Sequence, residues 1–139
     1  MGLSSVVQDF LSKGLECSVE NSLEAGSPKS ETHAFKVKAE NILIITEKEK
    51  EISLGKFIEY FKAGPRMLSR QETKELTGHP AGCLSPFGLK SPLKVYLDVS
   101  LLSDNHISVS AGMKNFVVKV SPGDIEKLTG GQWIDICKN

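Results

Sequence analysis

Two segments of the chain carry apolar residues at the spacing of an amphipathic helix. The first is residues 4–14, where Ser4 or Ser5 can cap the start of a helix and Gly14 can end it. The second is residues 52–63, which stops before a Gly-Pro pair. Shorter helices are predicted for residues 18–25, 69–76 and 121–128, and the middle one of these begins with a serine-glutamate capping box.

Alternating and continuous apolar runs predict strands elsewhere. Residues 33–45 alternate and end in the apolar run Ile42-Leu43-Ile44-Ile45, which predicts a two-stranded hairpin that turns near Ala39-Glu40-Asn41. Further strands are predicted for residues 67–68, 93–98, 107–111, 116–120 and 133–136. Because strands and helices mix without a regular strand–helix–strand rhythm, the pattern predicts an α+β fold with a mixed or largely antiparallel sheet.

Length, composition and charge indicate one globular domain over residues 1–139. Of the 139 residues, 40% are hydrophobic and 24% are charged, which is ordinary for such a domain. Seventeen basic residues balance 17 acidic ones, so the basic excess typical of nonspecific nucleic-acid binding is missing. An RNA substrate would therefore be gripped over a small part of its length or with the help of a partner. The charge run at residues 48–51 is expected to be a solvated turn.

Cys17, Cys83 and Cys137 are spaced too widely for a Cys-x-x-Cys pair or a zinc pattern. They indicate reduced thiols in an intracellular protein, and no metal or other cofactor is expected. The chain has no apolar run near the roughly 18 residues of a membrane-spanning helix and no signal peptide. A soluble, cytoplasmic protein without a membrane partner is therefore expected.

The stretch Thr-Gly-His-Pro-Ala-Gly-Cys-Leu-Ser-Pro-Phe-Gly at residues 77–88, here called the Gly82 loop, is too irregular to be core. Gly82 allows a ligand to approach the main chain closely. Pro86 fixes its own φ and favours an extended conformation for Ser85. These residues predict a stiff loop that presents backbone N–H and C=O groups, which can bind a polar ligand or orient a water. The alternative is an ordinary turn between a helix and a strand.

The Gly82 loop resembles the central signature of the YbaK/ProX family of aminoacyl-tRNA deacylases, which are related to the editing domain inserted in bacterial prolyl-tRNA synthetases. The resemblance continues through residues 93–98, 107–112 and 118–125, and covers the chain from about residue 69 to residue 136. It implies a strongly curved, barrel-like sheet flanked by helices. It also implies hydrolysis of the ester between a wrong amino acid and the terminal ribose of tRNA, without metal or covalent intermediate.

Several positions take roles from this resemblance. It implies catalytic positions at Gly82, Cys83 and Pro86, with Cys83 not acting as a nucleophile. Substrate-facing positions are expected at Leu84, Ser85, Ser110 and Gly112. Asp98, at the end of an apolar strand, is either a carboxylate of the site or the cap of the following turn.

The family also carries a lysine near the start of an early strand, in a pattern like Val-Lys-Thr-Leu-Val-Phe, whose ammonium can hold a phosphate or ribose. Three residues compete for this position. Strand alternation favours His33, with Phe35 and Val37 on the same face. Lys36 would lie on the opposite face, and Lys29 would need an insertion before the strand.

Two functions follow from these observations. The first is a trans-acting or synthetase-fused editing enzyme for Ala- or Cys-tRNA(Pro), whose partners would be the aminoacyl-tRNA acceptor end and prolyl-tRNA synthetase or a synthetase complex. The second is a noncatalytic module that binds aminoacyl-tRNA ends or docks in a synthetase complex. The intact Gly82 loop favours the first, whereas the displaced lysine and the neutral net charge leave room for the second.

Overall fold

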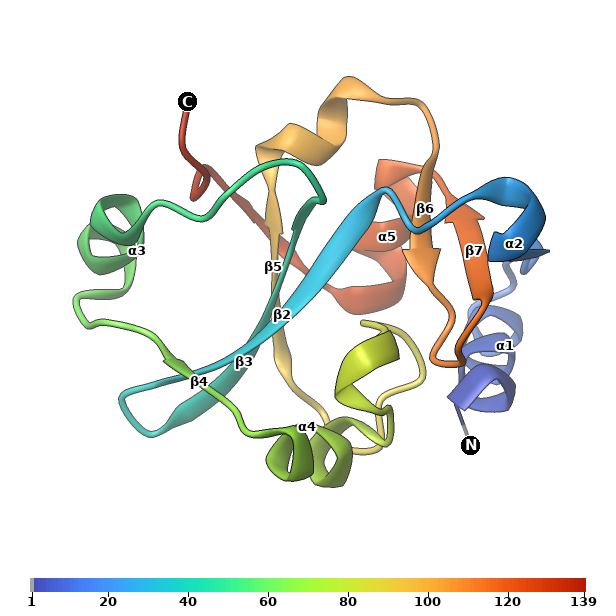
Figure 1. Cartoon of the computed structure of the whole chain (residues 1–139), viewed down its shortest axis with the longest axis horizontal. Helices are drawn as coiled ribbons and strands as arrows, with labels where there is room; N and C mark the ends of the chain where they lie inside the picture. The colour runs from blue at the N-terminus through green and yellow to red at the C-terminus, as the bar shows by residue number, and fades with distance from the viewer. Residues whose placement is uncertain (1) are drawn as a thin grey trace.

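Helices are interspersed among the strands along the chain in a computed structural model that describes residues 2–139 (Figure 1). The helices are α1 (Gly2–Ser12), α2 (Ser22–Ala25), α3 (Leu54–Phe61), α4 (Arg70–Thr77) and α5 (Pro122–Thr129), with 3-10 turns at Ala81–Cys83 and Val99–Ser103. The strands are β1 (Val19–Asn21), β2 (Ser30–Val37), β3 (Glu40–Glu47), β4 (Arg66–Met67), β5 (Lys94–Asp98), β6 (Ile107–Ser110), β7 (Phe116–Val120) and β8 (Gln132–Ile134).

The strands form two separate sheets, which confirms the mixed α+β prediction. One sheet has the order β4-β2-β3-β5-β8, and the other has the order β1-β7-β6. The pairs β3–β5 and β5–β8 are parallel, whereas the other pairs are antiparallel. Neither sheet closes on itself within residues 2–139, so the barrel-like closure that the resemblance implied is not found.

The predicted hairpin is present as β2 and β3, in register from Ser30↔Glu47 to Val37↔Glu40. The turn lies at Lys38-Ala39, slightly earlier than predicted, and Lys38 takes a left-handed φ of 57°. The continuous apolar run of β3 is explained by burial on both faces, as is typical of a strand with parallel pairing. Leu43 and Ile45 join the larger hydrophobic cluster, whereas Ile42 and Ile44 pack with Phe57 of α3.

Residues 18–25 differ from the helix that was predicted for them. Val19–Asn21 instead form β1, which pairs with Val118–Phe116 of β7. The helix is reduced to the four residues of α2, which begins where the Asn21 side chain accepts a hydrogen bond from the Leu23 amide at 2.8 Å. A strand of three residues is too short to show an alternating pattern in the sequence. The last strand also ends two residues earlier than predicted, at Ile134.

The larger hydrophobic cluster joins the two sheets and holds α1 against the Gly82 loop. It contains Val6 and Phe10 of α1, Ile125 and Leu128 of α5, and Phe87 from the loop. The rings of Phe10 and Phe87 meet edge to face, with centroids 5.1 Å apart. Such a pair contributes about 0.5–1.5 kcal/mol beyond the burial of its area. The end of the Gly82 loop is therefore fixed by the core.

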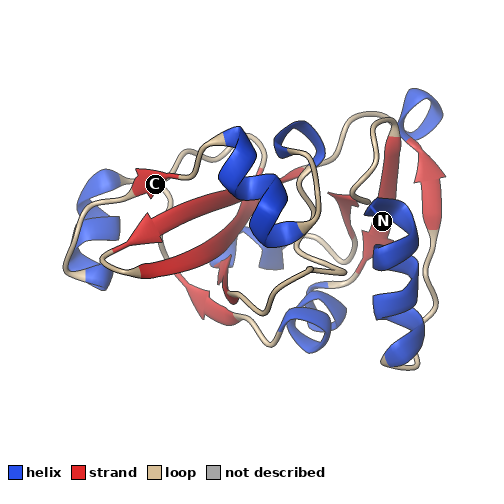
Figure 2. Cartoon of the chain, turned by 90° about the horizontal axis from the view of Figure 1, so that it is seen from below, coloured by secondary structure: helices blue, strands red, loops and turns tan. Residues whose placement is uncertain are grey.

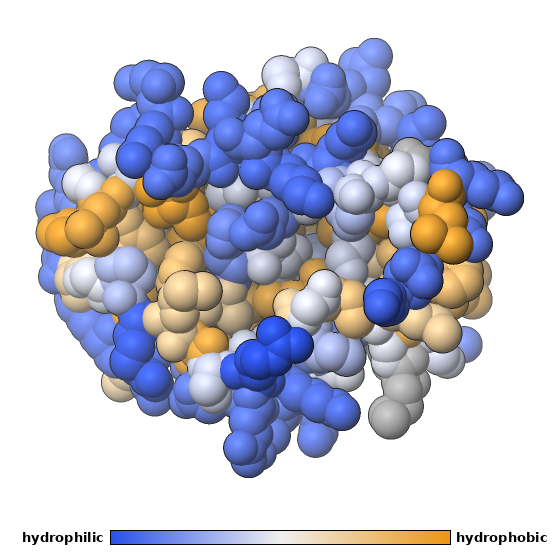
Figure 3. Space-filling view, viewed as in Figure 1, coloured by the Kyte–Doolittle hydropathy of each residue, from blue (hydrophilic) through white to orange (hydrophobic). Residues whose placement is uncertain are grey.

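The surface is mostly hydrophilic on the face seen in Figure 3, and hydrophobic side chains gather at its left, over α3. Leu54, Ile58 and Tyr60 of α3 are among the exposed large hydrophobic residues. The two termini lie at opposite ends of the molecule (Figures 1 and 2). Within residues 2–139, every helix is too short or too polar to cross a bilayer.

Candidate active site

A cavity of about 380 Å³ lies between the Gly82 loop and the edge of β2. β4 pairs only with Phe35 and Lys36 of β2, so within residues 2–139 the first half of β2 forms no strand ladder on that side. The Gly82 loop and the segment of Met67 and Leu68 border this open edge. The cavity therefore has main-chain groups on one wall and the loop backbone on another.

The cavity collects some of the residues that the sequence singled out and leaves others outside. His33, Gly82, Cys83, Leu84 and Ser110 line it. Lys29, Lys36, Ser85, Pro86, Asp98 and Gly112 are not among the lining residues. Pro86 instead borders a second hollow, of about 990 Å³, against α1. The cavity thus contains the middle of the Gly82 loop rather than its ends.

Buried hydrogen bonds hold the two ends of the Gly82 loop together. His79 is fully buried, and its Nε2 contacts the Phe87 carbonyl oxygen at 2.7 Å. The Phe87 amide donates to Ser85 Oγ at 3.2 Å, and the His79 amide donates to Thr77 Oγ1 at 3.0 Å. Because both ends are fixed, the segment between them projects as a rigid turn into the cavity.

The turn itself leaves particular backbone groups available. The Cys83 amide donates to the Pro80 carbonyl at 3.0 Å, and the Cys83 carbonyl accepts a hydrogen bond from Ser110 Oγ at 2.9 Å. Within residues 2–139, the amides of Ala81 and Gly82 donate no such bond. A methyl group on Gly82 would have its nearest neighbour, Arg70 Nη2, at 3.9 Å, so the loop is open at this residue.

Gly112 packs behind the loop rather than in the cavity. It has a left-handed φ of 80°, and a methyl group there would lie 2.5 Å from His79 Nδ1. The glycine therefore lets the buried imidazole approach the backbone closely. Ser110 connects the two features, because its hydroxyl donates to the loop and also accepts a bond of 3.4 Å from the Gly112 amide.

His33 offers the cavity a neutral imidazole. Its Nε2 lies 3.0 Å from Thr46 Oγ1, and its ring stacks on Phe35 with centroids 6.0 Å apart. Burial lowers the pKa of His33, and the Glu31 carboxylate, 3.5 Å from Nδ1, opposes this only in part. At neutral pH the side chain therefore carries little of the positive charge that the family lysine would supply.

The two lysines that competed with His33 lie elsewhere. Lys36 pairs in register with Asn41 and Arg66, near the hairpin turn. The Lys29 backbone connects β2 to the other sheet, because its amide donates to Ser108 Oγ at 2.8 Å. Neither lysine lines the cavity.

Two cations that the sequence analysis did not single out belong to the surroundings of this site, one in the cavity lining and one beside Gly82. Lys48, placed there in a solvated charge run, lines the cavity. Arg70, placed there only within a helix, has its Nη2 3.9 Å from where a methyl group on Gly82 would be. No local pattern marks either residue, because the tertiary fold brings Lys48 to the cavity and Arg70 to Gly82.

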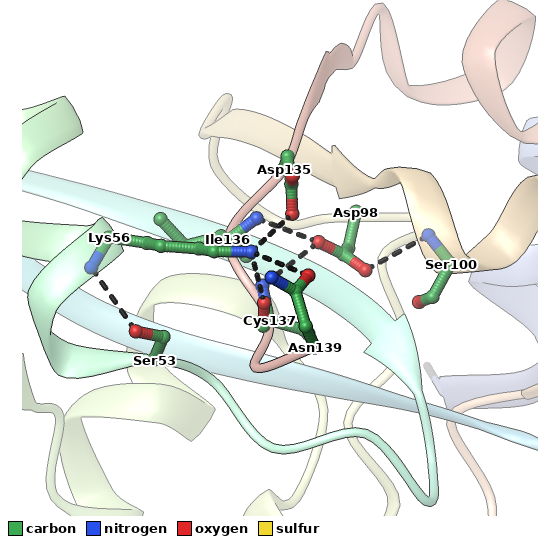
Figure 4. Close-up of polar contacts among 8 residues, drawn as sticks. All are labelled: Ser53, Lys56, Asp98, Ser100, Asp135, Ile136, Cys137 and Asn139. Carbon is green, nitrogen blue, oxygen red and sulfur yellow. Dashed lines mark hydrogen bonds and ion pairs between the residues drawn. The ribbon is translucent and has the colours of Figure 1, made fainter.

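Asp98, at the C-terminal end of β5, does not line the cavity and instead anchors the C-terminal segment (Figure 4). Its buried carboxylate accepts hydrogen bonds from the amides of Ser100 and Ile136, both at 2.9 Å, and from the Cys137 amide at 3.2 Å. Burial alone would raise the pKa of Asp98, but these hydrogen bonds hold it below its usual value. Of the two roles considered for Asp98, the structure shows the cap.

Around this carboxylate, burial together with the charge of Asp98 raises the pKa of Cys137 to about 12. Lys56 Nζ ties the same segment to α3 through the Cys137 carbonyl at 2.7 Å and Asp135 at 2.9 Å. Within residues 2–139, no three His, Cys, Asp or Glu side chains lie close enough together to hold a metal ion.

Acidification from about pH 7 to about pH 5 is expected to lower the free energy of unfolding through His79. Burial lowers the pKa of this imidazole. The unfolded chain therefore binds the proton first as pH falls below about 6.5, and stability is lost towards acid pH. Urea denaturation across this range should show a smaller loss in His79→Gln than in wild type. His33→Gln is the matched variant for comparison with His79→Gln, because burial also lowers the pKa of His33 and that residue can contribute to the same acid loss of stability. An unchanged acid loss in His79→Gln would contradict the assignment.

Comparisons with known proteins agree with the sequence resemblance. A family profile described as an aminoacyl-tRNA editing domain matches residues 25–128. The chain is 35% identical over 99 residues to "Uncharacterized protein YwhH" of Bacillus subtilis, covering 70% of this chain and 63% of that protein. It is 33% identical over 70 residues to "Putative Cys-tRNA(Pro)/Cys-tRNA(Cys) deacylase EbsC" of Enterococcus faecalis, covering 50% and 43%. The chain thus spans less than two thirds of both relatives.

The fold is shared with a solved protein described as "a putative trans-editing enzyme for prolyl tRNA synthetase". The two superimpose with a TM-score of 0.90 at 21% identity, over 99% of this chain and 98% of the other. The profile match extends over most of the chain and includes β2, β3 and the Gly82 loop. The chain therefore belongs to the family of aminoacyl-tRNA editing domains.

Proposed function

We propose that this chain hydrolyses the ester bond of mischarged aminoacyl-tRNA, with Ala- or Cys-tRNA(Pro) as the substrate, in trans or as part of a synthetase. The observation that carries the proposal is the cavity between the Gly82 loop and the open edge of β2. The name of the Enterococcus faecalis relative supports a proline tRNA bearing cysteine as one such substrate.

The ester needs positioning and charge stabilisation more than a strong nucleophile. A water that attacks the ester carbonyl produces a tetrahedral oxyanion, which preorganised N–H donors stabilise. The amides of Ala81 and Gly82 are suited to this role, because neither donates a bond within residues 2–139. Ser110 holds the adjacent carbonyl of Cys83 and so fixes the orientation of the turn.

The lining of the cavity supports binding of an aminoacyl group. Ala34, Leu68 and Leu84 give it apolar walls, and its volume is about 380 Å³. The aminoacylation site of a synthetase discriminates between side chains that differ by one methylene by only about 1–3 kcal/mol of binding free energy. An editing cavity that admits the smaller wrong residue and excludes the correct one supplies the missing discrimination.

A deacylation assay with a panel of mischarged tRNAs tests the proposal. Turnover of Ala- or Cys-tRNA(Pro) well above the spontaneous rate is expected, and the rate should be unchanged after dialysis against a chelator, because the proposed chemistry uses no metal. The neutral His33 favours one alternative, a noncatalytic module that binds aminoacyl-tRNA ends. Binding of the acceptor end without turnover of any substrate would establish that alternative and overturn the proposal.

Cys83→Ala is expected to retain most of the activity, with kcat/KM within about threefold of wild type. Burial raises the pKa of the Cys83 thiol, so the thiolate needed for nucleophilic attack is scarce at neutral pH. The contacts that place this residue use its backbone and not its sulfur. Steady-state deacylation kinetics check the prediction. Acyl-enzyme trapped on Cys83, or a folded but inactive variant, would show that the thiol is the nucleophile.

A further inference from the structure

We infer that Arg70 and Lys48 bind the phosphate that joins the last two nucleotides of the tRNA, in place of a lysine on β2. This inference rests on the proposed function, since it assigns residues to the nucleic-acid part of the same substrate. It starts from Lys48, which lines the cavity, and Arg70, which lies beside Gly82 at the border of the cavity, where the imidazole of His33 is neutral.

Arg70 is fixed beside the Gly82 loop by the start of α4. Ser69 Oγ accepts from the Glu72 amide at 3.0 Å, and Glu72 Oε1 accepts from the Ser69 amide at 2.9 Å. This capping box sets where the helix begins. The guanidinium then lies near Gly82, at 3.9 Å from the position of an added methyl group.

The guanidinium of Arg70 is available to a ligand. Within residues 2–139 it makes no hydrogen bond or ion pair, and the residue is exposed. Arg66, four residues earlier, is instead 3.4 Å from the Glu72 carboxylate. The two arginines therefore differ in charge pairing although they lie on the same short segment.

Lys48 supplies the second positive charge, from the segment after β3. It follows β3 directly, and its amide donates to the Lys29 carbonyl at 2.8 Å, which fixes its backbone. Among the residues that line the cavity within 2–139, it is the only lysine or arginine. Its ammonium makes no ion pair in that part of the chain, unlike Lys13, Lys56 and Lys138.

The chemistry of these groups fits a phosphodiester close to the ester. A guanidinium presents a planar fork that matches phosphate oxygens, and an ammonium acts as a point charge. The chain has no net charge, so this pair is a local feature rather than part of a general basic surface. The one carboxylate lining the cavity, Glu31, lies 3.5 Å from His33 Nδ1.

Kinetics with two substrates test the inference. Arg70→Gln should raise KM at least about tenfold for an aminoacylated minihelix ending in CCA, since a charged hydrogen bond contributes about 1.5–3 kcal/mol. It should leave kcat/KM unchanged for 3′-O-aminoacyl-adenosine, which has no phosphate. Lys48→Gln should show the same selectivity with a smaller effect. Arg66→Gln is the matched control and should change neither substrate.

Binding of the uncharged minihelix separates this inference from the proposed function, because it needs no hydrolysis. Fluorescence anisotropy should show that Arg70→Gln weakens binding and lowers the salt slope by about 0.7, the value for one phosphate contact on a single strand. If wild type binds in this way but turns over no ester, the proposed function fails and the phosphate site stands. If Arg70→Gln binds like wild type, or loses aminoacyl-adenosine hydrolysis equally, the phosphate site is wrong.

Discussion

Replacing Gly82 with valine is expected to lower kcat/KM for the mischarged tRNA by about 100-fold or more, because a substrate that cannot reach the Gly82 amide loses the stabilisation of one oxyanion donor. The branched side chain would fill the space where the substrate meets the loop backbone. The fold should tolerate the change, since Gly82 has no left-handed φ and an added methyl group meets only Arg70 Nη2, at 3.9 Å. The melting temperature should therefore stay within about 2 °C of wild type.

Gly82→Ala is the matched variant, because it adds one methyl group at ordinary contact distance and keeps the backbone conformation. We expect an intermediate rate for it and a wild-type melting temperature. Deacylation kinetics and thermal unfolding monitored by circular dichroism measure both quantities. Wild-type turnover in a folded Gly82→Val protein would show that the substrate does not approach the backbone of this residue.

Replacing Gly112 with alanine is expected to cost roughly 2–4 kcal/mol of the free energy of unfolding. The added methyl group would lie 2.5 Å from His79 Nδ1 and 2.7 Å from Cε1. His79 is fully buried and its Nε2 is held by the Phe87 carbonyl, so the ring cannot move aside without disturbing the Gly82 loop. A left-handed φ of 80° adds backbone strain for any residue with a Cβ.

Gly14→Ala separates these two contributions. Gly14 has a similar φ of 70°, but no atom would lie within 4 Å of an added methyl group. Urea denaturation of both variants should show a larger loss for Gly112→Ala, and the difference measures the contact with the imidazole. Equal losses would mean that only backbone strain matters, and that Gly112 is not needed for packing on His79.

The local pattern predicts most of the fold because most elements carry their own signals. The capping box at Ser69 and the apolar run of β3 each place an element from adjacent residues alone. The short strand β1 has no such signal, because its partner β7 lies almost 100 residues away. The Gly82 loop is marked by its glycines and proline, and the structure places its middle in the cavity.

The charges of the candidate site, unlike the helices and strands, cannot be predicted from the local sequence pattern. Alternation correctly puts His33 and Phe35 on one face of β2, as their stacked rings show. It cannot show that burial lowers the pKa of the imidazole, that Lys48 reaches the cavity from a turn, or that Arg70 reaches Gly82 from a helix start. Gly112 is similar. The sequence shows that a glycine stands there, but not that a glycine is needed because His79, distant in the sequence, packs against it. Such properties depend on tertiary contacts, which single-sequence patterns do not encode.

The cavity takes its walls from both sheets, since β2 belongs to one and Ser110 of β6 to the other. Hydrogen bonds join the sheets where Ser30 Oγ donates to the Ser108 carbonyl at 3.0 Å and the Lys29 amide donates to Ser108 Oγ at 2.8 Å. The width of the cavity is thus set at a seam, partly by Ser108, which does not line it. For the proposed deacylase, we therefore expect substitutions at Ser108 to change which aminoacyl group is accepted, although Ser108 does not line the cavity.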